Sequence, residues 1–495
     1  MKPRSPSSPA PQAARRARWV AGVLAAVVVL GTGGAWAWRQ HQRVARAQAA
    51  LPPMPDLSGK PEILADLLQQ AAAATRSGGT LLAGVEELGR LYHANDYRRE
   101  AEACWQFLRA EQPREARWVY YLADLRRAAG DQDGLARLLQ DTLRLAPDQV
   151  GARLQLANLQ LKSGEPEEAA RNFRLRLEAL PRDPYARLGL VRLAWSAGRK
   201  DEARALLEQL LKDTPDFSTA HNLYAELLAS AGDDAGAARH RWLGQEALRY
   251  REAADPWLDE LQASCYDYNR LCVLGSLEDQ TENLDRARDF YTRAIQLKPG
   301  EAQAYVLMSN LHFKRKEPAR ARDLLEQALP RLVGPKLPTV FTALSQAYRQ
   351  LGQPGEAIRV ARLGLAQAGE TAELYDALGL AQAAAGRHEE AVAAWQAGLA
   401  RNPGDAGMNF NLAVSLLALR RLDDTLAALD RSLTLQPTFL PTLLLRSEIE
   451  LDAGHLDLAE KYLRPAAETN PTHPQVRRLM AEWQKQREAA GKARP

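Results

Sequence analysis

Apolar and small residues recur at three- and four-residue spacing in pairs of short segments along most of the chain. In residues 372–405, Tyr375 and Leu378 share one face of a first predicted helix. Gly386 ends this helix, because glycine adopts left-handed backbone angles without a steric penalty, and Pro403 ends a second helix. Neither helix can bury its apolar stripe alone, so the pattern predicts a unit that stacks against copies of itself.

The copies are visible as a 34-residue frame that gives eleven units between Leu82 and Asn470. The prolines that close the units keep this spacing in two runs: Pro113, Pro147, Pro181 and Pro215, then Pro403, Pro437 and Pro471. The eighth place of a unit is small everywhere except at Val191: Gly89, Ala123, Ala157, Ala225, Gly275, Ser309, Ser345, Gly379, Ala413 and Ser447. The twentieth place is alanine everywhere except at Leu135 and Thr425: Ala101, Ala169, Ala203, Ala237, Ala287, Ala321, Ala357, Ala391 and Ala459.

This pattern of small, small, aromatic and proline residues resembles the tetratricopeptide repeat family over nearly four-fifths of the chain. The resemblance implies an all-α fold: a right-handed α-solenoid of about eleven helix-turn-helix repeats. It also implies that the first helices line a concave groove that binds peptides or partner proteins. Because one fold hosts many functions, the partner has to be argued from specific residues.

The N-terminal residues predict a membrane tether or a targeting segment. Residues 19–38, from Trp19 to Trp38, contain no charge, which suits one membrane-spanning helix with an aromatic residue at each interface. A cleaved signal peptide is the alternative, because Ala35-Trp36-Ala37 fits a signal-peptidase site. Both readings place the repeats outside the cytoplasm, on the periplasmic side; an inverted anchor would leave them in the cytoplasm.

The predicted organisation follows from the frame and its breaks. The segments are a disordered basic N-terminus (1–18), the transmembrane or signal-anchor helix (19–38), a stalk (39–60), an N-terminal cap helix (61–81), units one to five (82–249), an insertion (250–267), units six to eleven (268–471), and a C-terminal cap helix with a tail (472–495).

The distribution of charge along the chain argues against nucleic acid as a partner. The first 46 residues hold eight Lys or Arg and no acid, so the rest of the chain has 57 of the 65 basic residues against 61 acids. A mildly acidic array has no long-range attraction for phosphate backbones, and the sequence therefore predicts no nucleic acid partner.

The insertion at 250–267 is the one large break in the frame. Pro256 is expected to begin an extra helix that Asp255 caps, with Trp257 and Tyr266 as candidate contact residues. Two readings stay open: a structural helix that joins the two halves of the solenoid, or an element that contacts a partner. Cys265 and Cys272 are expected either as packed thiols or, if the chain bends between them, as a disulfide.

The chain shows no sequence motif of catalysis or metal binding. It has no HExxH, GxSxG, Walker or CxxC motif, and its eight histidines form no i,i+4 pair. We therefore predict a protein that is not an enzyme and that holds no cofactor and no metal.

The groove of the family frame supplies the candidate binding residues, which are aromatic, amide and charged side chains suited to an extended peptide. They are Tyr120, Asp124 and Arg127 from unit two, Asn158 from unit three, Tyr185, Arg192 and Trp195 from unit four, Asn222 and Glu226 from unit five, and Asn310 and Phe313 from unit seven. For Trp195 and Phe313, packing between neighbouring repeats is an equal alternative. A family subclass clamps a C-terminal carboxylate with paired Lys and Asn, but Leu154 stands at the lysine position beside Asn158.

Two function classes follow. The first is a membrane-tethered interaction scaffold for protein or peptide partners in cell-envelope assembly or secretion. The second is a non-catalytic accessory subunit of an envelope enzyme complex, such as a glycosyltransferase or a redox or cytochrome-maturation complex. Membrane-anchored repeat proteins of lipopolysaccharide assembly resemble the chain in architecture only, because their cysteine-paired metal-binding tail is not matched by the final EAAGKARP.

Overall fold

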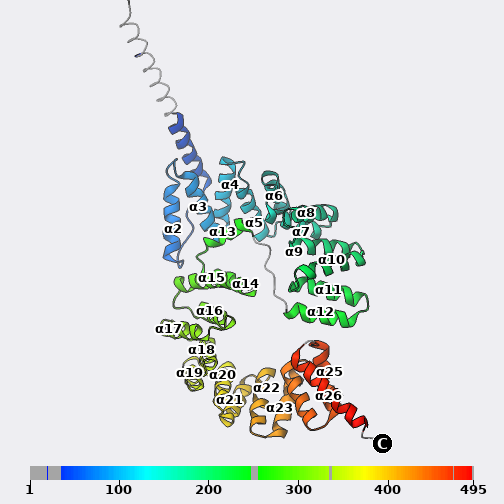
Figure 1. Ribbon diagram of the computed structural model, residues 1–495. Coiled ribbons are helices and arrows are strands. Elements are labelled where there is room, and N and C mark those ends of the chain that lie inside the picture. Colours follow the sequence, from blue (N-terminus) through cyan, green and yellow to red (C-terminus); the bar gives the residue numbers. More distant parts are fainter. Residues whose placement is uncertain are drawn as a thin grey trace, which may run out of the picture. The chain divides into compact units, whose positions relative to one another are not determined.

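A computed structural model describes residues 19, 35–246, 255–281, 283–333, 337–471 and 473–492. In these residues the regular elements are helices that follow one another in pairs, as in a tetratricopeptide solenoid (Figure 1). The predicted all-α class is thereby confirmed. The predicted N-terminus 1–18 and most of the predicted membrane segment 19–38 lie outside the described residues. Among the helices that are described, none has the length and apolar character needed to cross a membrane.

Each pair joins a first and a second helix of a repeat. The first helices are α3 (Leu81–Ala94), α5 (Ala116–Ala128), α7 (Val150–Lys162), α9 (Pro184–Ser196), α11 (Ser218–Ser230), α14 (Tyr268–Gln280), α16 (Ala302–Lys314), α18 (Pro338–Gln350), α20 (Ala372–Ala384), α22 (Ala406–Ala418) and α24 (Leu440–Asp452). The second helices are α4 (Arg98–Glu111), α6 (Gln132–Leu145), α8 (Pro166–Ala179), α10 (Lys200–Asp213), α12 (Asp234–Glu246), α15 (Leu284–Leu297), α17 (Pro318–Ala328), α19 (Pro354–Ala368), α21 (His388–Arg401), α23 (Leu422–Leu435) and α25 (Leu456–Thr469). Among the described residues, four helices stand outside the pairs: the helix at residues 35–50, α2 (Glu62–Ala74), α13 (Pro256–Ala263) and α26 (Pro474–Lys492).

The eighth place of a repeat is small because the aromatic side chain of the second helix lies against it. A Cβ atom on Gly379 would come within 2.6 Å of the Trp395 ring, and one on Gly89 within 2.6 Å of the Trp105 ring. Both tryptophans are almost completely buried. The turn that follows the first helix needs left-handed backbone angles, and Gly386 supplies them with a φ of +74°. These two requirements explain the repeat pattern in physical terms.

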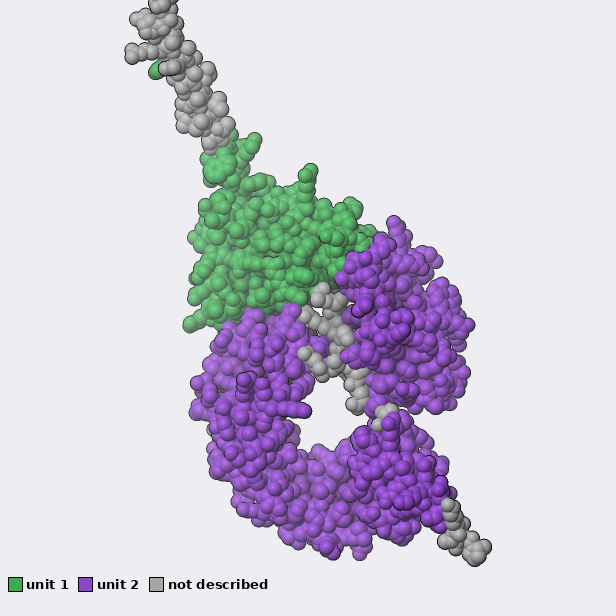
Figure 2. Space-filling view, viewed as in Figure 1, with its two compact units in different colours: residues 1–156, 255–266 green, residues 157–254, 267–495 purple. Residues whose placement is uncertain are grey.

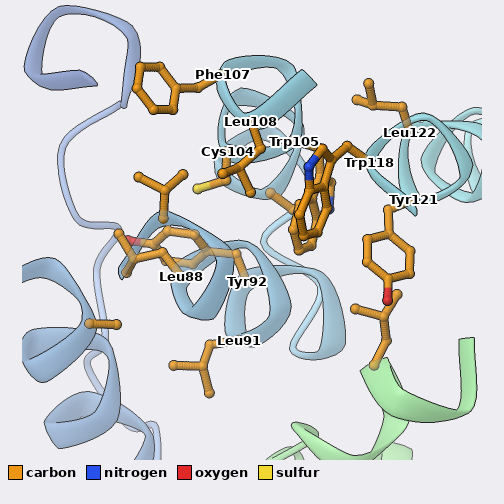
Figure 3. Packing of buried hydrophobic residues seen from close by; sticks show 14 of the residues in the cluster. Leu88, Leu91, Tyr92, Cys104, Trp105, Phe107, Leu108, Trp118, Tyr121 and Leu122 are labelled. Atoms are coloured by element: carbon orange, nitrogen blue, oxygen red, sulfur yellow. The ribbon is translucent and has the colours of Figure 1, made fainter. Parts of the chain in front are cut away.

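The chain divides into two compact units, coloured separately in Figure 2. Unit 1 comprises Met1–Leu156 and Asp255–Tyr266, and unit 2 comprises Ala157–Ala254 and Asp267–Pro495. In unit 1 the core centres on Trp105, which stacks on Trp118 with ring centroids 5.6 Å apart (Figure 3). The Tyr121 ring lies 4.8 Å from the Trp105 ring. These rings fill the space between α3, α4 and α5, so the first two repeats share one aromatic core.

Residues 35–50 form a helix that packs against this core. Ala47 is 1% exposed within it, and Arg43 and Arg46 form ion pairs with Glu111 at 2.9 and 2.8 Å. Residues 39–60, predicted as a stalk, therefore include a helix that belongs to the N-terminal core. The small side chain of Ala47 lets this helix lie close to the core. The sequence did not indicate the contact, because the prolines further along the segment are typical of an extended stalk.

In unit 2 a buried ion pair joins α8 to the start of α9. Arg176 donates from Nε and Nη2 to Asp183 Oδ2, at 3.0 and 2.6 Å, and both side chains are at most 5% exposed. Asp183 Oδ1 also accepts a hydrogen bond from the backbone N–H of Ala186 and so caps α9.

The three cysteines are buried free thiols, so Cys265 and Cys272 are not joined by a disulfide. Burial raises the pKa of Cys272 to about 11 and that of Cys104 still further. A thiol held in this way is protonated at neutral pH and acts as a small apolar side chain.

Candidate functional site

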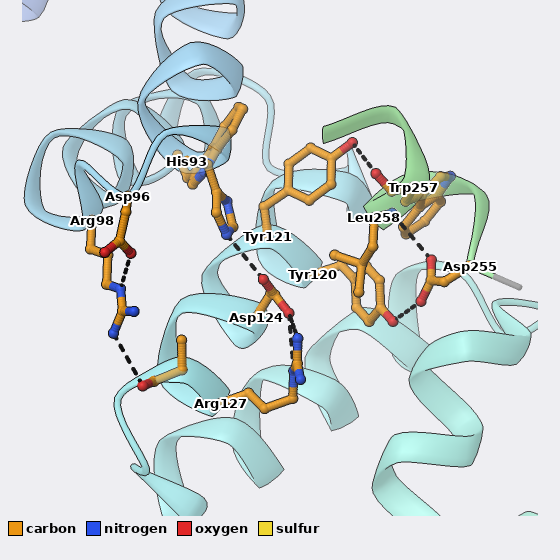
Figure 4. A network of polar contacts seen from close by, with 12 residues as sticks. His93, Asp96, Arg98, Tyr120, Tyr121, Asp124, Arg127, Asp255, Trp257 and Leu258 are labelled. Carbon is orange, nitrogen blue, oxygen red and sulfur yellow. Dashed lines mark hydrogen bonds and ion pairs between the residues drawn. The ribbon is translucent and has the colours of Figure 1, made fainter. Parts of the chain in front are cut away.

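In unit 1 the groove-facing side of the first repeats is covered by α13, the helix of the insertion (Figure 4). The Tyr120 hydroxyl donates a short hydrogen bond to Asp255 Oδ2. The Trp257 ring meets the Tyr120 ring edge-on at 5.6 Å, and the Tyr121 hydroxyl donates to the Trp257 carbonyl at 3.3 Å. Tyr120 is 1% exposed. Tyr120 and Trp257, predicted separately as partner contacts, therefore contact each other.

The far end of α13 and the residues after it are held on α3. Arg90 Nη1 pairs with Glu260 at 2.8 Å. Asn95 donates from Nδ2 to the Ser264 carbonyl at 2.9 Å and accepts from the Tyr266 N–H at 2.6 Å. The insertion thus binds α3 and α5 through side-chain hydrogen bonds within unit 1, and whether it joins the two halves of the solenoid or contacts a partner stays a prediction.

The first helix of the third repeat, α7, lies against Asp255. A Cβ atom on Gly151 would come within 2.3 Å of Asp255 Oδ2, so only glycine admits the carboxylate here. Gln155 Nε2 donates to the Tyr120 hydroxyl at 2.7 Å. Burial raises the pKa of Asp255 and outweighs its hydrogen bonds from Tyr120 and Leu258. Burial also raises the pKa of Tyr120, which keeps its hydroxyl a donor.

The raised pKa of Asp255 predicts a pH dependence for unit 1. A carboxyl group whose pKa is higher in the folded state than in the unfolded state destabilises the folded state when it ionises. The free energy of unfolding of unit 1 therefore falls as the pH rises from the unfolded-state pKa of about 4 through the raised pKa of the folded state. The charged and titratable groups around it are Tyr120 on α5 and Asp259 on α13, while Gly151 and Gln155 of α7 are neutral.

We expect Asp255→Asn to remove this decline and to leave unit 1 at least as stable as the wild type at pH 7, because asparagine keeps an acceptor for Tyr120 and is an equally good helix cap. Urea unfolding between pH 4.5 and 8 measures the effect. Asp131→Asn, at the exposed cap of α6, is the matched control and should leave the wild-type pH profile unchanged. An Asp255→Asn profile parallel to that of the wild type would contradict the role of this carboxyl.

Beside α13 the predicted residues Asp124 and Arg127 form an internal network. The His93 Nε2 atom lies 3.0 Å from Asp124 Oδ2, and Arg127 Nε donates to Asp124 Oδ1 at 3.0 Å. The Trp105 indole donates to His93 Nδ1 at 3.2 Å, so the ring proton of His93 faces Asp124. Burial alone would raise the pKa of Asp124, but the hydrogen bond from His93 and the charge of Arg127 hold it at about 2. Arg127 is half exposed and remains accessible.

The other predicted groove residues lie in unit 2 and differ in accessibility. Tyr185 packs edge-on against Phe217 at 5.3 Å, and Trp195 and Phe313 are half-buried against apolar clusters. Side chains that reach the surface are those of Arg192, Asn222, Glu226 and Asn310, while Asn158 is half-buried. For Trp195 and Phe313 the packing alternative therefore describes the observed environment. Whether the accessible residues bind a partner stays a prediction.

Sequence reasoning missed a hollow of about 330 Å³ on α18, α20 and the start of α22. Its lining comprises Thr339, Thr342, Ser345, Gln346, Arg349, Ala372, Glu373, Asp376, Ala377, Leu380, Asn402, Asp405 and Met408. Several of these occupy the second, fifth, ninth and twelfth places of units eight and nine, the same places that supplied the predicted residues in earlier units. Extending the frame to these units would have found them.

A half-buried carboxylate, that of Asp376, forms part of the wall of this hollow. Asp376 Oδ1 accepts from the Trp395 indole at 2.9 Å and from Asn411 Nδ2 at 3.2 Å. Burial raises the pKa of Asp376 despite these bonds and the nearby charge of Arg349. Around it, Gln346 and Glu373 make no hydrogen bond or ion pair to any other residue that the structure describes. The hollow therefore presents polar groups that are available to a ligand.

The surface becomes apolar on the next first helix. Phe410 on α22 packs edge-on against Phe439 at 6.0 Å and is only half-buried, and Val414, one turn later, is 42% exposed. They hold the fifth and ninth places of unit ten. Polar places on α18 and α20 are thus followed by apolar places on α22. We name these exposed first-helix places of α18, α20 and α22 the C-terminal groove.

The fold and these faces define a helical-repeat binding protein. Residues 167–227 and 280–337 match one tetratricopeptide repeat family description, and residues 377–438 match a second. The chain therefore contains tetratricopeptide repeats, and proteins built from these repeats bind peptides and proteins and are generally not catalytic.

Several solved structures are similar to parts of the chain. PilW, a widely conserved type IV pilus biogenesis factor, has 17% identity over 43% of this chain and 98% of its own, with a TM-score of 0.39. YrrB, a repeat protein with an unusual peptide-binding site, has 24% identity over 36% of this chain and 90% of its own, with a TM-score of 0.29. A chain of the Cut9–Hcn1 hetero-tetramer of the APC/C has 13% identity over 84% of this chain and 98% of its own, with a TM-score of 0.37. No curated protein matches the chain, and similarities at these TM-scores carry no argument about function.

Proposed function

We propose that the chain is a protein-interaction scaffold whose open recognition surface is the C-terminal groove. The observation that carries this proposal is the contrast between the two groove faces. On unit 1 the aromatic Tyr120 is covered and hydrogen-bonded within the chain, whereas Gln346 and Glu373 in unit 2 line a hollow without partners among the described residues.

The chemistry of the C-terminal groove suits an extended protein segment. Thr342 and Gln346 offer donors and acceptors for a peptide backbone, and Arg349 supplies a charge for an acidic side chain or terminus. Phe410 and Val414 then offer apolar area for a hydrophobic side chain. The proposed ligand is therefore a segment with an acidic group followed by an apolar anchor.

We further propose that the scaffold is tethered to a membrane by residues 19–38, with its repeats on the periplasmic side, and that it serves envelope assembly or secretion. Support comes from the uncharged run between Trp19 and Trp38 and from the five basic residues that precede it. A catalytic protein among the captured partners would instead favour the accessory-subunit alternative.

The test is photo-crosslinking of the full-length chain in its membrane, with the crosslinking residue at Thr339. We expect the double variant Gln346→Ala with Arg349→Glu to lose the crosslinked partner at least tenfold. Arg192→Glu, an exposed arginine on α9, is the matched control and should retain capture. Equal capture by all three chains would contradict the C-terminal groove, and loss with Arg192→Glu alone would move the site to α9.

A further inference from the structure

The insertion lies on unit 1 in the way that a ligand lies in a repeat groove. It contacts groove places of three successive first helices: Arg90 at the ninth place of unit one, Tyr120 at the fifth place of unit two, and Gly151 at the second place of unit three. These are the same kinds of place that line the C-terminal groove. The chain itself therefore shows which chemistry this face accepts.

The occupant is a short, preorganised segment. Asp255 accepts a hydrogen bond from the Leu258 N–H and so caps α13, and Pro256 stands at its first position. Trp257 then packs on Tyr120, Glu260 pairs with Arg90, and Leu261 is 4% exposed in the unit 1 core. The recognised pattern is an acidic cap, a proline and a tryptophan, followed within one turn by an acid and an apolar anchor.

The contact is limited in extent. A helix of eight residues is not stable alone in water, so the order of α13 depends on the face beneath it. Only Leu261 of this helix is fully buried, and the stacked rings of Trp105 and Trp118 come from α4 and α5 and not from α13. The raised pKa of the buried Asp255 further weakens the contact at neutral pH. Such a contact can be exchanged without unfolding the repeats.

We propose that this face of unit 1 is a second protein-recognition site, which α13 occupies in cis until a partner helix with the same acid-proline-tryptophan start displaces it. The site is separate from the C-terminal groove, so each can fail without the other.

The test uses a fluorescent peptide of residues 255–266, with Cys265→Ser to prevent oxidation, and full-length protein. In an opened variant, Trp257→Ala with Glu260→Arg, the cis contact is weakened. Anisotropy should show that this variant binds the peptide at least tenfold more tightly than the wild type does. Glu260→Arg alone, which alters one half-exposed side chain, should give the same direction of change if the double variant folds poorly.

Charge reversal locates the peptide. In a variant opened instead by Trp257→Ala with Glu260→Ala, which leaves no charge at position 260 to pair in cis, adding Arg90→Glu should reduce peptide binding at least tenfold, and a peptide carrying Glu260→Arg should restore it. Arg144→Ala, at an exposed arginine on α6 of the same unit, is the control and should leave binding of this peptide unchanged.

Three results would overturn the proposal. The first is an opened variant that keeps the wild-type thermal melt and binds no peptide, since α13 would then be a fixed structural element. The second is binding that survives Arg90→Glu. The third is wild-type protein that is dimeric in light scattering and becomes monomeric with the peptide, because a second copy of the chain would then be the occupant.

Discussion

Replacing Asp183 by alanine is expected to lower the free energy of unfolding of the repeats around α8 and α9 by about 3–5 kcal/mol. The substitution leaves the Arg176 guanidinium buried without its carboxylate, and an uncompensated buried charge is strongly destabilising. It also removes the cap of α9, which contributes roughly 1 kcal/mol. Urea unfolding, with hydrogen exchange read separately for α8 and α9, measures the loss where it occurs.

Arg187 and Asp213 provide the matched control, because they form the same kind of ion pair at a partly exposed position. Asp213→Ala should lower the free energy of unfolding far less than Asp183→Ala does, since solvent screens the exposed pair. The double variant Arg176→Met with Asp183→Asn should recover most of the loss, because no buried charge remains. Equal losses for Asp183→Ala and Asp213→Ala would show that burial does not decide the strength of this contact.

Trp105→Ala should destabilise unit 1 by about 3–5 kcal/mol, the usual cost of truncating a buried tryptophan. The ring is fully buried, stacks on Trp118, and donates a hydrogen bond to His93. Because repeats contact mainly their neighbours, the loss should be confined to α3–α6. Hydrogen exchange of the full chain should show faster exchange there and an unchanged rate in α20–α23.

Trp483→Ala in α26 is the control for this prediction. That ring is half-buried and donates one hydrogen bond to the Leu456 carbonyl at 3.0 Å, so its removal should cost less than about 2 kcal/mol. Uniformly faster exchange along the whole chain after Trp105→Ala would mean that the solenoid unfolds as one cooperative body, against the expectation.

The repeat architecture was predictable because each recurring residue meets one local requirement. Gly379 leaves room for Trp395, which follows 16 residues later in the same unit, and Gly386 gives the turn its left-handed angles. The same requirements apply in every unit, so the same residue types recur at the same places many times along the sequence. The helix at residues 35–50 was not predicted as part of the core, because it has no copy elsewhere.

The functional faces were less predictable, because a repeat frame tells which places face the groove but not what covers them. Tyr120 is covered by Asp255, 135 residues later. Histidines show the same limit: a search for i,i+4 pairs finds none, yet His221 and His240 lie with their Nδ1 atoms 2.9 Å apart on α11 and α12. Burial and the neighbouring His221 lower the pKa of His240 to about 4, so His240 is uncharged at neutral pH. A hydrogen on one of the two Nδ1 atoms then joins the pair.

The separation of 135 residues between Tyr120 and Asp255 also sets an order of events during synthesis. At roughly 5–20 residues per second, the ribosome delivers α13 about 7–27 s after the face that it covers. Helix pairs fold through local contacts in far less time than this. Each newly made chain therefore presents the Tyr120 face uncovered for several seconds, and a partner already waiting at the site of synthesis has its easiest access in that interval.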